Sequence, residues 1–373
     1  MDIKRLSRQT CRLLQPPGVV SWANVGGRLE RQGPLGSYFD VTDDDSFFGK
    51  KTWEQGEAEM QAIALRRALQ KGGLTPQDVD CVFAGDLLNQ NIGATFSLRD
   101  FAIPFYGVYG ACSTMGESLS LAAMAVAGGF ARIAAAQTSS HFCTAERQYR
   151  APVPYGSQRA PTAQWTATAA GCCVVGAQSE GPYITHTVRG RIVDLGVTDV
   201  ANMGAAMAPA AYDTLTALFR DTGTAPSDYD LVVTGDLGYL GHALLVELFR
   251  RDGVVLGDNC TDCGILLYDR VKQDMHAGGS GCGCSAAVLN GYLLQGLRMG
   301  KWQRLVFAPT GALLSPTSSF QGESVPASAT RWYFPTPRRR SKWNISMHFS
   351  AADCCAPWVR SSSTAPTSPP PVS

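Results

Sequence analysis

Two segments of this chain repeat the same order of signals, and this repeat is the strongest constraint on the fold. Residues 80–88 have the sequence DCVFAGDLL and residues 230–238 have the sequence DLVVTGDLG. Each segment follows a helical pattern and a short acidic turn, TPQD or APSD. Apolar runs that alternate with helical patterns indicate α/β units. The repeat therefore favours an α/β protein built from two duplicated halves, which we place at residues 1–180 and 181–326.

Helix and strand patterns alternate through both halves. The first half predicts helices over 53–71 and 113–127 and strands over 80–85, 107–111 and 131–137. The second half predicts helices over 208–221, 242–251 and 286–299 and strands over 230–235, 264–268 and 304–309. The helix over 113–127 is apolar nearly all round, so we expect it to be buried.

Charge and hydropathy exclude several classes of protein. The 373 residues include 32 Lys and Arg against 31 Asp and Glu, and this balance argues against a nucleic-acid binder. No transmembrane helix is expected, because every long apolar run contains a charge or a polar break. The basic N-terminus lacks the apolar core of a signal peptide. Without an export signal, the 12 cysteines are expected to be reduced thiols in a cytosol-like compartment.

The segment 327–373 differs in composition from the rest of the chain. It holds seven of the 21 prolines, three of the seven tryptophans and six of the 32 basic residues, and Asp353 is its one acid. It shows no helix or strand periodicity and ends in Ser, Thr and Pro low complexity. Two interpretations stay open: a disordered basic tail that contacts acidic lipid or a partner, and a frameshift just after Pro326. The abrupt change of composition favours the frameshift.

The segment GACSTMGESL places a cysteine at a turn from strand to helix. Cys112 follows a predicted strand, and the buried helix begins directly after it. The unpaired N–H groups and the dipole of a helix N-terminus stabilise a thiolate, and small neighbours allow a sharp turn like a nucleophile elbow. Acyl-transfer enzymes present a cysteine in this way. A cysteine at a buried helix start also packs as a small apolar group, so both interpretations stay open.

This segment and several others resemble known proteins. ACSTMGESL resembles the nucleophile region of the thiolase and ketoacyl-synthase superfamily. Most of residues 1–326 is similar to the stage V sporulation protein AD family of endospore-forming bacteria. The similar segments are TSSHFCTAERQYR (138–150), MGAAMAPAAYDT (203–214), DYDLVVTGDLG (228–238), TDCGILLYD (261–269), HAGGSGCGCSA (276–286) and TGALLSPTSSFQGES (310–324).

The resemblance implies a fold, a ligand and partners. The implied fold is the thiolase-like αβαβα layered fold. The implied function is binding of dipicolinic acid (pyridine-2,6-dicarboxylate), as the free acid or its calcium chelate, for uptake into the developing spore. No other cofactor is expected. The implied partners are the other subunits of a dipicolinate transport complex at the spore inner membrane, where the protein would lie peripherally or at the cytoplasmic face; a homodimer stays open. The family ends in a short strand soon after the GES motif, and the departure of residues 327–373 leaves that strand in question.

Eight residues are candidates for the ligand site. They are Cys112, Ser113, His141, Arg147, Asp236, Asp262, His276 and Ser280. Backbone N–H groups around Cys112 would face one carboxylate, and His141 follows a predicted strand, where α/β folds place ligands. Arg147 offers a guanidinium to a diacid, although a solvated basic loop explains it equally well. Asp236 and Asp262 suit calcium or hydrogen bonding, or simply form turns.

The catalytic set of a thiolase is incomplete in this sequence. His276 lies near the position of the superfamily's catalytic histidine, but the following glycines have the wrong spacing and the proline is missing. A second catalytic cysteine is not visible. We therefore expect a pocket that has lost condensation chemistry. The alternative is an active acyltransferase with Cys112 as its nucleophile.

A zinc site is the remaining hypothesis that the cysteines raise. Cys260 and Cys263 have C-x2-C spacing, but the C-x-C pair of Cys282 and Cys284 is not the usual second half of a zinc site. We expect these thiols to pack tight turns, and we predict no metal site.

Overall fold

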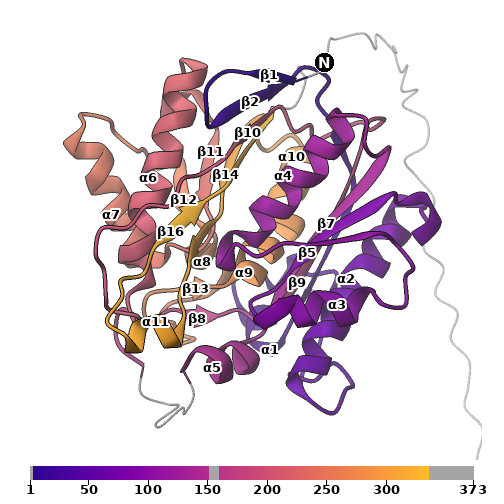
Figure 1. Cartoon of the computed structure of the whole chain (residues 1–373), viewed down its shortest axis with the longest axis horizontal. Helices are drawn as coiled ribbons and strands as arrows, with labels where there is room; N and C mark the ends of the chain where they lie inside the picture. Colours follow the sequence, from indigo (N-terminus) through magenta and orange to yellow (C-terminus); the bar gives the residue numbers. More distant parts are fainter. Residues whose placement is uncertain (1–2, 151–158, 336–373) are drawn as a thin grey trace, which may run out of the picture. The chain divides into compact units, whose positions relative to one another are not determined.

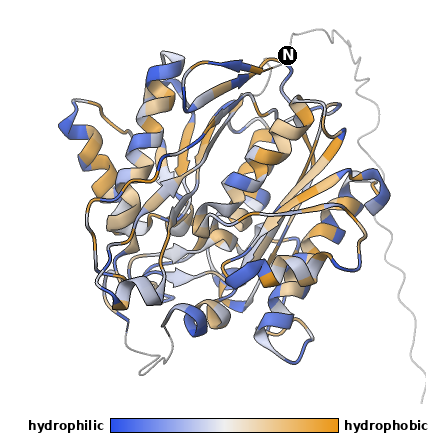
Figure 2. Cartoon of the chain, viewed as in Figure 1, coloured by the Kyte–Doolittle hydropathy of each residue, from blue (hydrophilic) through white to orange (hydrophobic). Residues whose placement is uncertain are grey.

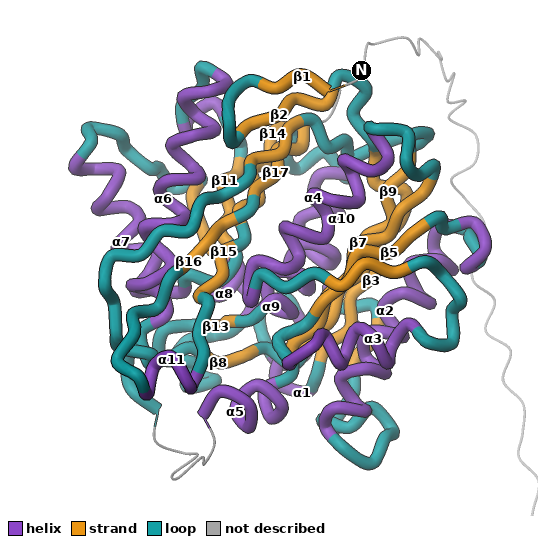
Figure 3. Tube along the Cα trace, in the orientation of Figure 1, coloured by secondary structure: helices purple, strands orange, loops and turns teal. Residues whose placement is uncertain are grey.

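The computed structural model of the chain describes residues 3–150 and 159–335. Two sheets and three layers of helices make up this part (Figures 1 and 3). The six-stranded sheet has the order β4-β3-β9-β7-β5-β6, and the seven-stranded sheet has the order β1-β2-β10-β17-β14-β11-β12. Two short pairs, β13-β8 and β15-β16, lie apart from these sheets.

The strands are mostly short. Their bounds are β1 Ile3–Arg5, β2 Thr10–Leu13, β3 Gly18–Gly26, β4 Val41–Thr42, β5 Cys81–Gly85, β6 Phe105–Gly107, β7 Ile133–Ser140, β8 Trp165–Thr166, β9 Ala169–Gly176, β10 His186–Val188, β11 Leu231–Thr234, β12 Cys260–Asp262, β13 Gly279–Ser280, β14 Arg304–Ala308, β15 Thr310–Ala312, β16 Ala327–Ala329 and β17 Arg331–Pro335.

The helices range from one turn to five. Their bounds are α1 Arg28–Gln32, α2 Trp53–Gly72, α3 Ile92–Leu98, α4 Thr114–Ala127, α5 Phe142–Arg150, α6 Met203–Thr222, α7 Gly238–Arg251, α8 Cys263–Leu267, α9 Cys282–Val288, α10 Leu294–Arg298 and α11 Pro316–Phe320. A π-helical turn, Leu289–Leu293, joins α9 to α10.

The layers follow the order helix, sheet, helix, sheet, helix. Helices α2 and α3 cover the outer face of the six-stranded sheet, and α6 and α7 cover the outer face of the other sheet. Helix α4 contacts β7 of one sheet and β17 of the other, so it lies between them, and α9 packs beside it. Central strand β9 is mainly hydrophobic, and β7 is hydrophobic in its first half and polar over residues 137–140 (Figure 2). This confirms the predicted thiolase-like αβαβα layering.

The duplication is visible in matching details of the two halves. Helices α2 and α6 each begin with a side-chain N-cap, Thr52 or Asn202, and each ends at a glycine with left-handed backbone, Gly73 or Gly223. A short 3-10 turn with proline at its start then leads into β5 or β11. Both strands are followed by parallel partners, because β5 pairs with β6 and β7 and β11 pairs with β12 and β14.

The two ends of the described chain join the same sheet. The hairpin of β1 and β2 pairs with β10 rather than with a strand of the first half. All six strands of the six-stranded sheet therefore lie within residues 18–176. Residues 3–13 belong to the seven-stranded sheet. The predicted division at residue 180 did not anticipate this exchange, because three- and four-residue strands carry too little pattern.

The segment after Pro326 contains two strands, so the expectation that 327–373 lacks strand structure is wrong for residues 327–335. Strand β16 pairs with β15, and β17 lies between β10 and β14, antiparallel to both. Phe334 packs into the core between the sheets, and its neighbour Tyr333 packs against the outer core of the second half. Residues 336–373, the rest of the predicted tail, lie outside the described residues.

The prediction of a strand over 264–268 is also wrong. Residues Cys263–Leu267 form helix α8, and the strand is β12, three residues earlier. The side chain of Asp262 accepts a hydrogen bond from the backbone N–H of Gly264 at 2.9 Å, and this N-cap starts the helix. A five-residue apolar run does not distinguish a buried strand from a buried helix by period alone.

Candidate functional site

A sharp turn presents Cys112 at the start of helix α4. Strand β6 ends at Gly107, four residues earlier than the predicted strand, and a 3-10 turn over Ala111–Ser113 leads into the helix. Ala111 has a φ of 51°, in the left-handed region that a non-glycine residue rarely adopts. The hydroxyl of Thr114 donates to the carbonyl of Ala111 at 2.6 Å, which holds this backbone in place. The expected elbow-like turn is therefore present.

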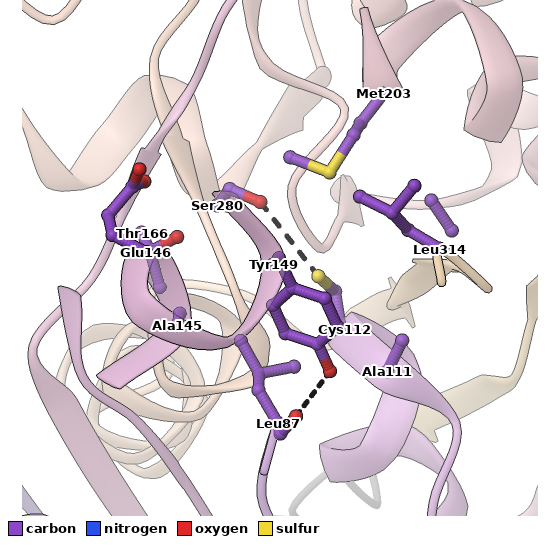
Figure 4. A pocket seen from close by; sticks show the side chains of 11 residues that line it. Leu87, Ala111, Cys112, Ala145, Glu146, Tyr149, Thr166, Met203, Ser280 and Leu314 are labelled. Atoms are coloured by element: carbon purple, nitrogen blue, oxygen red, sulfur yellow. Dashed lines mark hydrogen bonds between the residues drawn. The ribbon is translucent and has the colours of Figure 1, made fainter. Parts of the chain in front are cut away.

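A pocket opens in front of this turn, where segments of both halves meet. It encloses about 470 Å³ of space, its open mouth included. Its lining residues are Leu87, Ala111, Cys112, Ala145, Glu146, Tyr149, Thr166, Met203, Ser280, Ala312 and Leu314. Cys112 is 5% exposed, and Figure 4 shows its sulfur facing Ser280 across the pocket. Leu87 follows the carboxyl end of β5, and such strand ends are the usual place for a ligand in an α/β fold.

Three polar side chains form a hydrogen-bonded chain at the base of this pocket. The sulfur of Cys112 lies 3.8 Å from the hydroxyl oxygen of Ser280. Ser280 donates to one carboxylate oxygen of Asp236 at 2.9 Å, and the backbone N–H of Gly281 donates to the same oxygen at 3.0 Å. Thr310 donates to the other oxygen of Asp236 at 3.0 Å. Asp236 is thus held in a fixed orientation behind Ser280.

The electrostatic surroundings keep Cys112 in its thiol form. Burial raises the pKa of Cys112 well above its ordinary value, and the negative charge of Asp236 raises it further. Burial also raises the pKa of Asp236 to about 7, although hydrogen bonds to its carboxylate act in the opposite direction. A nucleophilic cysteine needs a lowered pKa or an adjacent base, and the helix start at α4 does not outweigh burial here.

Helix α5 forms one wall of the pocket and is held at both ends. Near its start, Thr144 donates to the buried carboxylate of Glu57 at 2.7 Å. Near its end, the side-chain amide of Gln148 donates to the carbonyl of Leu87 at 3.1 Å, and the hydroxyl of Tyr149 donates to the same carbonyl. Tyr109 extends this contact, because its hydroxyl lies 2.5 Å from that of Tyr149.

A second buried acidic group lies behind the wall. Burial, and then the charge of Asp86, raises the pKa of Glu57 to about 8, and burial raises the pKa of Asp86 to about 6. Asp86 accepts hydrogen bonds from the backbone N–H groups of Leu88 and Ala94 at 2.8 and 2.7 Å. These carboxylates shape the β5–α3 loop and α5, and neither lines the pocket.

Of the eight predicted residues, Cys112 and Ser280 line the pocket, and Asp236 contacts Ser280 from behind. Ser113 is buried in the turn, with its hydroxyl 2.7 Å from the carbonyl of Gly110. Asp262 is also buried, and it accepts from the backbone N–H groups of Leu237, Gly238 and Gly264. The turn-forming interpretation of Asp262 is therefore correct, and it fixes the backbone that follows Asp236.

The other three predicted residues lie outside the pocket lining. His141 is fully buried, with its Nε2 2.7 Å from the carbonyl of Ser46 and its Nδ1 accepting from the N–H of Cys143. Arg147 forms an ion pair with Glu54 and lies over the ring of Trp53. His276 contacts the carbonyl of Ala160 and the carboxylate of Asp274. The polar groups of each of these side chains already bond to neighbouring residues. The spacing of residues in the sequence does not show these contacts.

The sequence analysis missed the wall of the pocket. Ala145, Glu146 and Tyr149 lie one helical turn apart or less on the segment 138–150, whose His141 and Arg147 were chosen instead. The hydrophobic pattern of α5 could have identified this face, because residues four apart lie together on a helix. Met203 and Leu314 come from the second half, and no local signal connects them to Cys112.

No histidine activates Cys112 among the described residues. Of the four histidines in residues 3–150 and 159–335, none lines the pocket. The described part of the chain also contains no group of three or more His, Cys, Asp or Glu arranged to hold a metal ion. Cys260, Cys263, Cys282 and Cys284 are buried and pack in the hydrophobic clusters.

None of the described helices has the length and the apolar character needed to cross a membrane.

Comparisons with known proteins agree with this geometry. A model of the family "Stage V sporulation protein AD" matches residues 7–331. The stage V sporulation protein AD of Bacillus subtilis (strain 168) is 43% identical over 327 residues, which cover 88% of this chain and 96% of that protein.

Solved structures of condensing enzymes share the fold at low sequence identity. The 3-oxoacyl-[acyl-carrier-protein] synthase III of Aquifex aeolicus has a TM-score of 0.51 at 13% identity, covering 85% of this chain and 100% of that one. An OleA variant of Xanthomonas campestris has a TM-score of 0.56 at 12% identity, covering 86% of this chain and 98% of that one. The similarity to these solved structures shows the fold, and the sequence match shows the family. The chain is therefore a member of the stage V sporulation protein AD family, a family of sporulation proteins, and it has a thiolase-like fold.

Proposed function

We propose that this sporulation protein binds dipicolinic acid in the pocket at Cys112 and takes part in its uptake into the developing spore. The observation that carries the proposal is the state of Cys112: its thiol faces a partly open pocket, yet burial and Asp236 raise its pKa. A pocket of this kind presents a thiol to a ligand without activating it as a nucleophile. Binding without turnover is what such a site supports best.

The charge of the pocket favours the calcium chelate as the ligand. None of the described lining residues is Lys or Arg, and Glu146 and the nearby Asp236 are acidic. Burying a free dianion beside them would be costly, because nothing there compensates its charge. The calcium chelate of dipicolinate has no net charge, so its transfer from water costs far less. Thr166 supplies a hydroxyl group that a carboxylate can accept from.

We propose further that the protein works at the surface of the spore inner membrane with the other subunits of a dipicolinate transport complex. A homodimer would pair edge strand β6 with its copy, since β6 is the last strand of its sheet. Tyr106 on this strand is 59% exposed and Tyr109 beyond it is 44% exposed. An edge strand with exposed aromatic side chains is a ready template for pairing.

Calorimetric titration tests the binding proposal. The protein is titrated with dipicolinate in the presence and absence of calcium, beside Cys112→Ala and Ser280→Ala. Cys143→Ala is the matched control, because Cys143 is not among the pocket-lining residues. We expect saturable binding that is tighter with calcium, and weaker binding for both pocket variants only. No binding by a folded protein, in either condition, would overturn the proposal.

The alternative function, acyl transfer through Cys112, is supported by the turn geometry alone. The positive φ of Ala111 and the position of Cys112 at the start of α4 resemble a nucleophile elbow. Incubation with acyl-coenzyme A followed by mass spectrometry separates the two functions. A covalent acyl adduct on Cys112 would favour the acyltransferase, and an unmodified protein that binds dipicolinate would favour the ligand-binding function.

A further inference from the structure

One aromatic ring lies among the described residues that line the pocket, that of Tyr149. Figure 4 shows this side chain between Leu87 and Cys112, with its hydroxyl directed toward the carbonyl of Leu87. The ring therefore borders the same space as the Cys112 thiol. It comes from helix α5, whereas Cys112 lies in the 3-10 turn before α4 and Ser280 lies in β13.

The ring of Tyr149 is fixed in its orientation. Its hydroxyl donates to the carbonyl of Leu87 and contacts the hydroxyl of Tyr109. Two partners at the end of the side chain, together with packing against Leu87, Cys112 and Ala145, leave it little rotational freedom. A preorganised ring loses little conformational entropy when a ligand packs against it.

The pocket also separates apolar from polar surface. Leu87, Met203 and Leu314 supply apolar side chains, and Ser280 and Thr166 supply hydroxyls. This combination suits a ligand with a flat apolar ring and polar substituents at its rim. Ring contacts beyond simple burial contribute about 0.5–1.5 kcal/mol, which corresponds to a change of roughly twofold to tenfold in Kd.

We propose that Tyr149 is the specificity-determining residue of this pocket and selects planar aromatic dicarboxylates by ring-to-ring contact. The inference rests on the proposed function and assigns it a residue that recognises the ring of the ligand rather than its carboxylates. Tyr109 acts as a positioning residue, because it contacts the hydroxyl of Tyr149 and is not itself among the lining residues.

The test compares two variants of Tyr149 in calcium-containing buffer, with the full chain. Tyr149→Phe keeps the ring and loses the hydroxyl, and Tyr149→Leu keeps apolar bulk and loses the ring. We expect Tyr149→Phe to bind dipicolinate within about threefold of the unchanged protein, and Tyr149→Leu to bind it roughly tenfold more weakly. Tyr183→Phe is the control for loss of a tyrosine hydroxyl, because this hydroxyl donates to the carbonyl of Ser179 and Tyr183 does not line the pocket. Thermal melting establishes that each variant is folded.

A second ligand separates ring contact from general damage to the pocket. cis-Piperidine-2,6-dicarboxylate keeps both carboxylates and the ring nitrogen, but its ring is saturated and puckered. Tyr149→Leu should weaken dipicolinate binding more than binding of this analogue. Equal dipicolinate affinity in the Leu and Phe variants would overturn this inference alone. Absence of dipicolinate binding by the unchanged protein would overturn the proposed function, and the inference with it.

Discussion

The hydroxyl of Ser280 lies 3.8 Å from the sulfur of Cys112 and also donates to the carboxylate of Asp236. The thiol at the elbow turn is therefore next to an acid and a hydroxyl rather than a histidine. Burial and the charge of Asp236 raise the pKa of Cys112 and so stabilise the protonated sulfur, whereas the hydrogen bond with Ser280 acts in the opposite direction. This arrangement explains how a fold shared with condensing enzymes can enclose a cysteine that is not activated.

The thiol of Cys112 should react slowly with alkylating reagents. Because burial and Asp236 raise its pKa, little thiolate exists at pH 8. We expect its alkylation by iodoacetamide to be at least roughly tenfold slower than that of a free thiol of ordinary pKa. Peptide mass spectrometry over a time course measures the rate at this residue. Asp236→Asn should accelerate the reaction, and faster alkylation in the unchanged protein than in glutathione would contradict the assignment.

Stability should fall as the pH rises from about 5 to 8. The pKa values of Glu57, Asp86 and Asp236 are raised to about 8, 6 and 7, above their ordinary values of 4.5, 3.8 and 3.8. Between the ordinary pKa and the raised pKa of each group, the folded state binds more protons than the unfolded state. An increase in pH through this range therefore lowers the free energy of unfolding. We expect the Tm to be roughly 5 °C or more higher at pH 5.5 than at pH 8. Asp236→Asn should reduce this dependence, and a Tm that rises toward pH 8 would refute it.

Asp262 should matter for stability rather than for ligand contact. Its buried carboxylate accepts from three backbone N–H groups and from the hydroxyl of Thr234. Asp262→Ala leaves these donors without a partner, which we expect to cost about 3 kcal/mol or more in the free energy of unfolding. Urea denaturation measures the loss. Asp258→Ala, at an exposed position before β12, is the matched control and should change stability little.

The edge strand β6 should mediate any homodimer. Tyr106→Lys places a charge on the exposed edge, where it would oppose pairing of two copies. Sedimentation of the unchanged protein should show a dimer, and the variant should shift toward the monomer without a loss of Tm. Phe130→Lys, which alters another exposed aromatic side chain, is the control. A dimer that survives Tyr106→Lys would place the interface elsewhere.

The sequence predicted the framework well, because long periodic segments and caps carry strong local signals. The helix predicted over 53–71 is observed at 53–72, the helix predicted over 208–221 begins five residues earlier, at Met203, and the turn at Cys112 follows from small residues before a buried helix. Short elements were harder to predict. The apolar run 264–268 is a helix because Asp262 caps it, and β17 is a strand because two neighbours flank it. The cap is a local contact that the apolar pattern hides, whereas β17 depends on pairing with strands that are distant in the sequence.

The candidate site was predicted only in part for the same reason. Ser280 and Asp236 were found because each lies in an unusual polar turn of a resembling segment, and they meet Cys112 in space. His141 and Arg147 have residue types that suit a diacid, but their local partners, Ser46 and Glu54, occupy them. Residue type alone does not show whether a side chain already has a partner.

The position of β17 has a consequence for synthesis of the protein on the ribosome. The six-stranded sheet uses residues 18–176 and can assemble while the second half is still being translated. The N-terminal hairpin, although made first, joins β10, which reaches β14 only through β17 at residues 331–335. The hairpin of β1 and β2 therefore cannot join the same sheet as β14 until β17 has been made. A premature stop before residue 331 would leave the second sheet split into two pieces, however complete the pocket residues were.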